Sequence, residues 1–222
     1  MIYRRLATSC VHRGYSSKAG KIVFDPETLA TFAARLKSLP PTPRWHLKTD
    51  TPREAAILMP LCTVKDIPSV LFQVRQRKMR KHGGEVAFPG GSKDATDVSL
   101  EDTALRETME EISLPSSSIQ VLGTFQTVPD RTQTIMVTPF LGYCGELDPQ
   151  TMTFNSDEVS EVFAVPLDFF LDSNNRGIQQ FRGMGPAARW MYQEKYDIWG
   201  LTSYVLHNML RLVIAPDTYP TL

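Results

Sequence analysis

The chain has 222 residues, 42% of them hydrophobic, and its 24 basic and 24 acidic side chains give a formal net charge of zero. This length allows one sizeable hydrophobic core, and the balanced charge argues against binding of nucleic acid through a cationic surface. The longest apolar runs, such as Ala55 to Met59, are far shorter than the roughly 20 residues of a membrane helix. We therefore expect neither nucleic acid nor a membrane as a partner.

The first 21 residues differ in composition from the rest of the chain. They contain five Arg or Lys residues, and no Asp or Glu occurs before Asp25. A start that is free of acids and contains arginine and serine is typical of a mitochondrial transit peptide. We therefore predict a presequence at residues 1–21, delivery to the mitochondrial matrix, and a single domain at residues 22–222. The alternative for the first segment is an ordinary disordered terminus.

Two helix starts can be recognised in the sequence. Asp25 and Pro26 provide an N-cap and a proline at the first helical position, which predicts a helix that extends to about Leu39. Ser99, with Asp102 three residues later, forms a capping box at the start of a second helix. Both starts depend only on side chains close in sequence.

Apolar segments between turn residues predict a β-sheet. Residues 55–62 and 69–75 should pair as antiparallel strands in its centre. Strands lie before and after the acidic helix that begins near Ser99, so we expect a mixed sheet between helices, an α/β protein of the α+β type with α/β/α layers. The other expected elements are a strand at 85–88, a turn at 89–91, strands at 119–127 and 136–143 around a loop at 128–134, a strand at 158–165, a short helix or turn at 166–171, a hairpin at 181–192 and a final helix from Trp199 that packs through Leu201, Val205, Leu206, Met209 and Leu212.

The second helix carries three glutamates on one side. At about 100° per residue, Glu107, Glu110 and Glu111 fall within about 100° of one another. Like charges at these spacings repel by a few tenths of a kcal/mol per pair, so we predict a divalent cation, Mg²⁺ or Mn²⁺, bound through their oxygens. The alternative is a solvated acidic surface. The opposite side of the helix should pack through Leu105, Met109 and Ile112.

Positively charged side chains flank these glutamates. Arg106 can hold one of them in place through a charge-assisted hydrogen bond. The most basic segment of the chain extends from Arg75 to His82 and leads into the glycine turn before the helix. Cations opposite metal-binding carboxylates suggest a polyphosphate between them, with Arg75 and Arg80 as candidates for its phosphates. The alternative for this segment is a solvated loop.

Residues 91–114 resemble the Nudix box, in which a glycine and a variable loop precede Arg-Glu-hydrophobic-x-Glu-Glu-x-Gly-hydrophobic. The matching residues are Arg106, Glu107, Glu110, Glu111 and Leu114. Residues 71–75 and the pattern Arg80-x-x-x-Gly84-x-x-x-Phe88-Pro89-Gly90-Gly91 are similar to the further signature of the coenzyme A diphosphatase branch, as are residues 157–163 and 198–202. The resemblance covers roughly residues 55–220. Together with the presequence, it points to the mitochondrial type of this branch.

Several positions depart from these patterns. The residue eight places before Arg106, where the box has a glutamate, is Val98, and Asp97 lies one place earlier. Ser113 replaces the box glycine at the exit of the helix, where we expect a modest structural cost. The remaining departures are Thr108 at a hydrophobic position and Phe72, Gln73 and Gln76 in place of the usual residues of the branch.

The resemblance implies a Nudix fold and metal-dependent hydrolysis of the diphosphate in coenzyme A or acyl-coenzyme A. The products would be 3′,5′-ADP and 4′-phosphopantetheine or acyl-phosphopantetheine. In this interpretation Arg106 and the three glutamates are catalytic, and Mg²⁺ or Mn²⁺ is bound by Glu107, Glu110, Glu111 and the carbonyl group of Gly91. The substrate would be bound by Arg75, Arg80, Gly90 and Gly91.

Some questions stay open at this point. The general base could be Glu110, Glu111, Glu158 or Glu161, and the protein could be a monomer or a homodimer. The same box would also suit an ADP-sugar, a dinucleotide polyphosphate or an oxidised nucleotide as the substrate. A catalytically silent module that binds coenzyme A is the alternative from a different functional class.

Overall fold

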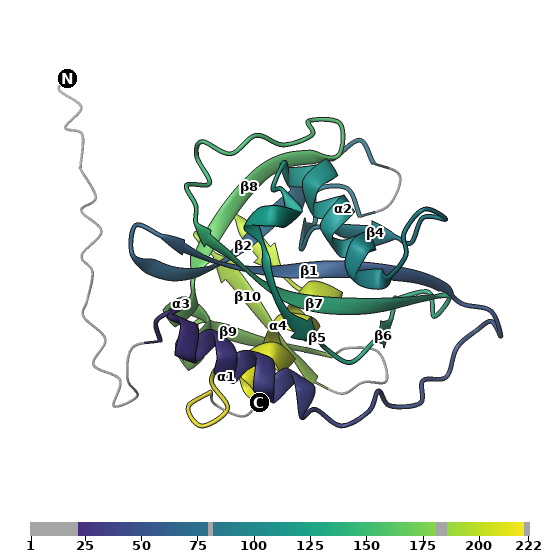
Figure 1. Cartoon of the computed structure of the whole chain (residues 1–222), viewed down its shortest axis with the longest axis horizontal. Helices are drawn as coiled ribbons and strands as arrows, with labels where there is room; N and C mark the ends of the chain where they lie inside the picture. Colours follow the sequence, from purple (N-terminus) through teal and green to yellow (C-terminus); the bar gives the residue numbers. More distant parts are fainter. Residues whose placement is uncertain (1–21, 80–81, 181–185, 220–222) are drawn as a thin grey trace, which may run out of the picture.

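The computed structural model describes residues 22–79, 82–180 and 186–219 (Figure 1). Two predictions concern residues outside these ranges: the presequence at residues 1–21 and the phosphate-binding role of Arg80. Part of the hairpin expected at 181–192 also lies outside them, since residues 181–185 are not described.

A mixed eight-stranded sheet forms the centre of the molecule, as predicted. Strands β1 and β2 are antiparallel and joined at Lys65 and Asp66, which both have left-handed φ angles, 50° and 62°. Strand β7 lies parallel to β1 on its other side, which makes the sheet mixed. The strands are β1 (Arg53–Val64), β2 (Ile67–Arg75), β3 (Val86–Ala87), β4 (Gly90–Ser92), β5 (Gln120–Thr124), β6 (Val128–Pro129), β7 (Ile135–Glu146) and β8 (Val159–Pro166).

Helices cover both faces of this sheet, so the expected α/β/α layers are present (Figure 1). On one face α2 packs over β1, and Ala104 and Ile112 join a core with Ala56 and Leu58. On the other face α1, α3 and α4 share a larger core that includes Phe32, together with a three-stranded sheet. The helices are α1 (Pro26–Lys37), α2 (Leu100–Ile112), α3 (Leu167–Leu171) and α4 (Gly200–Met209, continued by a π-helical turn over Leu210–Ile214), and the small sheet consists of β9 (Arg176–Gln180), β10 (Pro186–Tyr192) and β11 (Tyr196–Ile198).

Both predicted helix caps are present. The Asp25 side chain accepts a hydrogen bond of 2.8 Å from the amide of Thr28 at the start of α1. Ser99 and Asp102 form a reciprocal capping box at the start of α2. None of the helices in the described part of the chain combines the length and apolar composition that crossing a membrane requires.

The packing side predicted for α2 is wrong in part. Met109 is 50% exposed, whereas Glu111 is only 1% exposed and lies against the sheet. The side that packs also includes Ala104, Thr108 and Ile112. The prediction placed all three glutamates on the side opposite to the packing residues, but the neighbouring strands supply polar partners for Glu111, so this carboxylate can be buried.

Three other local predictions need correction. The turn expected at 89–91 contains the start of β4, which pairs with β1. The loop expected at 128–134 begins with the short strand β6. The hairpin expected at 181–192 is instead the single strand β10 over residues 186–192, which lies between β9 and β11. Neither of these partner strands was predicted. In each case pairing with another strand decides the conformation: β4 pairs with the distant β1, whereas β6 and β10 pair with strands next to them in the chain.

Candidate active site

Glu111, on the last turn of α2, is the buried centre of the candidate site. Its Oε2 atom accepts hydrogen bonds from Nε2 of Gln73, at 2.8 Å, and from the backbone amide of Gly90, at 2.9 Å. Its Oε1 atom lies 3.2 Å from Nη1 of Arg75. Gln73 and Arg75 are two residues apart on β2, so both side chains project to the face of the sheet that α2 covers. Three elements therefore meet at one carboxylate.

The environment of Glu111 disfavours its charged form. Burial raises its pKa to about 7, although Gly90, Gln73 and Arg75 each act to lower it. The three donors therefore compensate only part of the loss of solvation. A further positive charge close to this carboxylate would stabilise the ionised form.

Arg106 organises the solvent side of α2. Its Nε and Nη2 atoms donate to the two carboxylate oxygens of Asp97, at 2.9 and 3.0 Å. Its Nη1 atom donates to Glu107 and Glu110, at 3.1 and 3.0 Å, and Nη2 also reaches the carbonyl oxygen of Ser92. Arg106 thus holds two glutamates, as the sequence suggested for one, and ties them to the preceding loop.

Asp97 makes the ion pair that Val98 cannot make. The Arg106 guanidinium, together with the hydroxyl of Thr103, keeps the pKa of Asp97 well below its usual range. Val98 is 92% exposed. The departure from the box pattern therefore leaves a carboxylate next to Arg106.

Close packing at β4 requires glycine. A Cβ atom on Gly91 would lie 2.3 Å from Oε1 of Glu107, and one on Gly90 would lie 2.3 Å from the carbonyl oxygen of Ala56. Gly90 also has a φ angle of 151°, which favours glycine. The Gly91 backbone therefore lies close to the Glu107 carboxylate.

The chemistry of these donors suits a hard divalent cation. Carboxylate and carbonyl oxygens are the preferred ligands of Mg²⁺, and burial raises the pKa of Glu107 despite Arg106, with Glu110 and Glu158 raising it further. Within the described residues, no three His, Cys, Asp or Glu side chains converge on one metal position. Glu107 and Glu110 point to Arg106, and Glu111 points to its donors from β2 and β4.

Two of the candidate bases lie in different surroundings. Glu158, just before β8, is close enough to Glu107 to raise its pKa. Glu161 pairs with Val74 on β2, so its side chain lies on the face opposite to Gln73 and Arg75. There it binds Nζ of Lys195, at 2.7 Å, and the hydroxyl of Tyr196, at 2.6 Å. The structure thus separates Glu161 from the glutamates of α2.

Only part of the basic segment reaches the glutamates. Arg75 contacts Glu111, whereas Lys78 pairs with Asp157 on the surface, at 2.7 Å. Arg80 lies outside the described residues. Sequence reasoning missed Gln73 as a partner of Glu111, although its departure from the branch pattern could have drawn attention to it.

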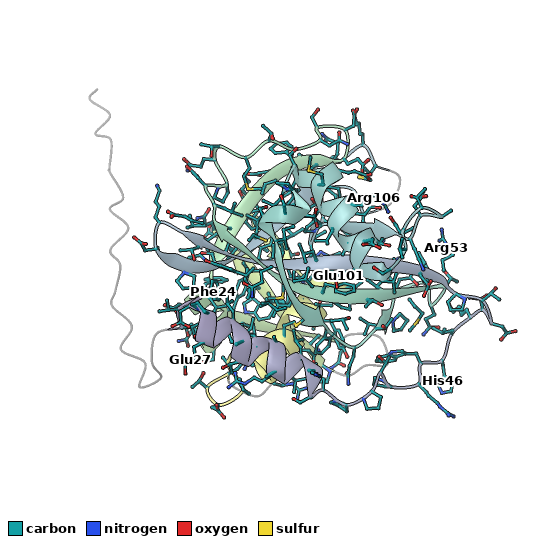
Figure 2. The ribbon with its side chains drawn as sticks, viewed as in Figure 1. Phe24, Glu27, His46, Arg53, Glu101 and Arg106 are labelled. Carbon is teal, nitrogen blue, oxygen red and sulfur yellow. The ribbon has the colours of Figure 1, made fainter. Side chains whose placement is uncertain are left out.

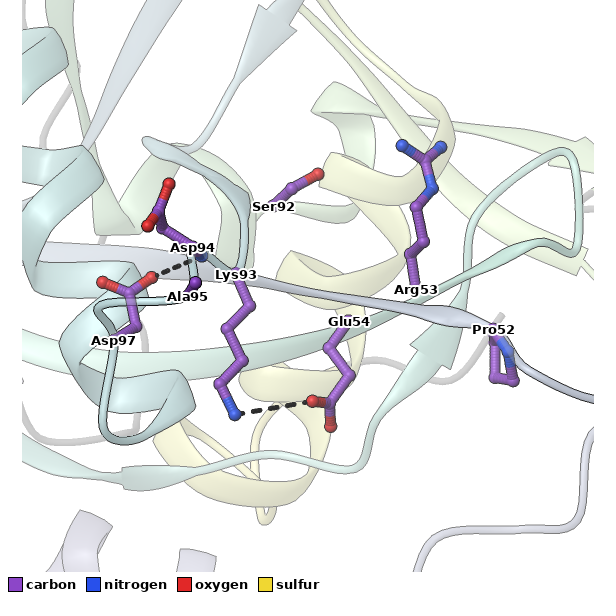
Figure 3. Close-up of a pocket in the computed structure, with 8 residues that line it drawn as sticks. All are labelled: Pro52, Arg53, Glu54, Ser92, Lys93, Asp94, Ala95 and Asp97. Carbon is purple, nitrogen blue, oxygen red and sulfur yellow. Dashed lines mark hydrogen bonds and ion pairs between the residues drawn. The ribbon is translucent and has the colours of Figure 1, made fainter.

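An open hollow of about 480 Å³ is lined in part by Asp97, the ion-pair partner of Arg106. Figure 3 shows the residues that line it. It is lined by Arg53 and Glu54 at the start of β1 and by the loop from Ser92 to Asp97, where Lys93 pairs with Glu54 at 3.5 Å. Figure 2 shows Arg53 and Arg106 on the same side of the molecule. Glu107 and Glu111 do not line this hollow, so it adjoins the carboxylates without containing them.

The chain is similar to several known proteins. The family model of the NUDIX domain matches residues 51–181. The human protein named mitochondrial coenzyme A diphosphatase NUDT8 is 39% identical over 172 residues, which are 76% of this chain and 72% of that protein. The mouse protein of the same name is 36% identical over 197 residues, 87% of each chain. A solved MutT/nudix family protein from Enterococcus faecalis is 20% identical, with a TM-score of 0.49 over 84% of this chain and 74% of that one.

Proposed function

Because this chain belongs to the NUDIX domain family and is a Nudix hydrolase, we propose that it hydrolyses the diphosphate of coenzyme A and acyl-coenzyme A. The observation that carries the proposal is the arrangement of the three glutamates of α2: Gly91 lies against Glu107, Arg106 binds Glu107 and Glu110, and the guanidinium of Arg75 contacts Glu111. The names of the human and mouse relatives support the substrate. The products are 3′,5′-ADP and 4′-phosphopantetheine or its acyl derivative.

In the proposed reaction a water molecule attacks one phosphorus of the diphosphate. A new P–O bond forms, the bond from that phosphorus to the bridging oxygen breaks, and the bridging oxygen leaves on the other phosphate. Nudix hydrolases generally use divalent metal ions; Mg²⁺ or Mn²⁺ bound by Glu107, Glu110, Glu111 and the Gly91 carbonyl would polarise the diphosphate and lower the pKa of the attacking water.

The residues around the glutamates have separate parts in this proposal. Arg106 keeps Glu107 and Glu110 in place through its hydrogen bonds and, through Asp97, fixes them to the loop. Arg75, whose side chain is 20% exposed, can exchange Glu111 for a substrate phosphate, because guanidinium binds both anions well. Gly90 and Gly91 pack closely against β1 and Glu107, and their backbone is proposed to bind the substrate beside the carboxylates. Arg80 is the second proposed phosphate ligand.

Glu158 is the proposed general base. It lies in the electrostatic neighbourhood of Glu107, so it can accept the proton that the attacking water loses. Glu161 is less suitable, because Lys195 and Tyr196 already occupy its carboxylate on the other face of the sheet.

Product analysis with the full chain tests this function. Incubation with coenzyme A and Mg²⁺ or Mn²⁺ should release 3′,5′-ADP and 4′-phosphopantetheine in equal amounts, measured by liquid chromatography. Faster hydrolysis of an ADP-sugar, a dinucleotide polyphosphate or an oxidised nucleotide would contradict the substrate. Tight binding of coenzyme A without turnover at any divalent metal would contradict hydrolysis altogether.

The proposed site of action is the mitochondrial matrix. The composition of residues 1–21 and the word mitochondrial in the names of two relatives support it. A fluorescent protein fused after residue 30 should colocalise with a matrix marker. A diffuse cytosolic signal would count against the presequence.

A further inference from the structure

Gln73 is a polar side chain in a place where the sheet is otherwise apolar. It lies on β2 between β3 and β8, directly after the buried residues Leu71 and Phe72, and it is itself fully buried. A buried amide is costly unless its donors and its acceptor both find partners. The position therefore requires a reason beyond packing.

The amide group of Gln73 is satisfied at one end only. Its Nε2 atom donates to Oε2 of Glu111, at 2.8 Å, the same oxygen that accepts from the Gly90 amide. Its Oε1 atom is buried and has no hydrogen-bond partner among the described residues. Since carboxylates without a proton only accept, Glu111 cannot satisfy this oxygen in its ionised form.

The two ends of the amide have different consequences for the site. The donor end fixes the orientation of Glu111 relative to β4, the strand that brings Gly91 against Glu107. The acceptor end provides a buried oxygen beside Glu111 that suits a donor from outside the protein. Residues that orient metal ligands by hydrogen bonds often affect the affinity of the metal as strongly as they affect activity.

We propose that Gln73 is a positioning residue of the divalent-metal site: its Nε2 atom holds the Glu111 carboxylate, and its Oε1 atom accepts a hydrogen bond from a water molecule of the loaded site. The inference rests on the proposed metal-dependent function. It assigns to Gln73 no contact with the reacting atoms.

The test measures Mn²⁺ binding apart from catalysis. The free Mn²⁺ signal in electron paramagnetic resonance gives the dissociation constant for the full chain and for Gln73→Met, which keeps the volume and removes both polar atoms. We expect Mn²⁺ to bind about 10- to 100-fold more weakly to the variant. The kcat for coenzyme A should fall by a similar factor, whereas KM should change little, because Gln73 does not contact the substrate.

Two further variants keep this test decisive. Gln73→Asn retains a buried amide but is one methylene too short to keep its bond to Glu111, so it should lose affinity as the Met variant does. Thr108→Val is the matched control: Thr108 is fully buried on α2, and its hydroxyl donates to the carbonyl oxygen of Ala104, so its removal should leave Mn²⁺ affinity unchanged. Thermal unfolding in EDTA shows that each variant is folded.

The outcomes separate this inference from the proposed function. Unchanged Mn²⁺ affinity in either folded Gln73 variant would overturn the inference, and so would an equal loss in Thr108→Val. If the wild type binds Mn²⁺ but releases no 3′,5′-ADP from coenzyme A, the substrate is wrong and the role of Gln73 still stands on the affinities. Absence of Mn²⁺ binding by the wild type would overturn both.

Discussion

Strand β2 contributes side chains to both faces of the central sheet. Each face holds a carboxylate, and the two carboxylates differ in their surroundings. On the α2 face, Gln73 and Arg75 surround the buried Glu111. On the other face, Phe72 stacks between Phe88 and Phe163, with ring centroids 5.0 and 5.6 Å away, and Glu161 is bound there by a lysine and a tyrosine. Alternate residues of one strand thus serve chemistry and packing.

The pKa values of the two carboxylates move in opposite directions. Burial raises the pKa of Glu111 to about 7, more than its three donors lower it. Partial burial also acts to raise the pKa of Glu161, but Lys195 and Tyr196 lower it overall. Lys195 and Tyr196 already stabilise the charge of Glu161. The donors around Glu111 offset only part of the cost of burying its charge. The α2 face, which holds Glu111, is therefore the face that can bind a further cation.

The largest expected effect is on turnover at Glu111. Glu111→Gln removes the charge but keeps a side chain that can still bond to its neighbours, so turnover of coenzyme A should fall by roughly 1000-fold while the protein stays folded. Steady-state kinetics and circular dichroism check this. Glu101→Gln, an exposed change in the first turn of the same helix, is the control. Turnover within a few-fold of the wild type would contradict the assignment of Glu111 as a metal ligand.

The pH dependence of stability should also report on Glu111. Its pKa is higher in the folded chain, about 7, than its ordinary value of 4.5, so between these values the folded state binds more protons than the unfolded state. The stabilisation is fully present below about pH 4.5 and is lost as the pH rises through about 7, a decrease in the free energy of unfolding of up to about 3 kcal/mol. Urea unfolding in EDTA measures it. If the free energy of unfolding changed equally with pH in the wild type and in Glu111→Gln, Glu111 would not be the cause of the change.

The contrast between Glu158 and Glu161 provides the next test. Glu158→Gln should lower kcat by at least about 10-fold, because a general base would be lost. Glu161→Gln should leave kcat nearly unchanged and lower the melting temperature, because it weakens the bond to Lys195. Parallel kinetics and thermal unfolding compare the two variants. A larger loss of kcat in Glu161→Gln would mean that the second face takes part in catalysis.

The Asp97 ion pair should have a smaller effect. Asp97→Asn leaves Arg106 without its bidentate partner, so kcat should fall by about 10-fold as Glu107 and Glu110 lose their fixed positions. Val98→Ala, one residue further along, should have no effect, since Val98 is exposed. Similar kinetics for the two variants would show that Arg106 does not need this partner.

The smallest expected effect is on stability alone. Ser113 ends α2 with a left-handed φ of 55° and donates its amide to the carbonyl oxygen of Met109. Glycine adopts this conformation without steric cost, so Ser113→Gly should stabilise the protein by up to about 1 kcal/mol. Urea unfolding measures the change, and kcat should stay as in the wild type. A destabilised variant would show that the serine side chain has a role of its own.

Much of the fold could be predicted because its signals are local. The caps at Asp25 and Ser99, the tight connection at Lys65 and Asp66, and the spacing from Arg106 to Glu111 all depend on residues a few positions apart. The small sheet was missed although its strands are consecutive in the chain. Strands β9 and β11 are short, and their pairing with β10 depends on contacts between segments, which single-segment patterns do not contain.

The sequence by itself determined which carboxylates and cations the protein has and that one helix carries Glu107, Glu110 and Glu111 on one side. Only the tertiary structure decided what surrounds each one. Helix α2 packs over β1, and β2 and β4 meet it with an amide, a backbone N–H and a guanidinium, so Glu111 becomes buried while Glu110 stays exposed. The strand partners of β8 likewise place Glu161 on the aromatic face. Burial and charge compensation arise from residues distant in sequence, and they set the pKa values of Glu111 and Glu161.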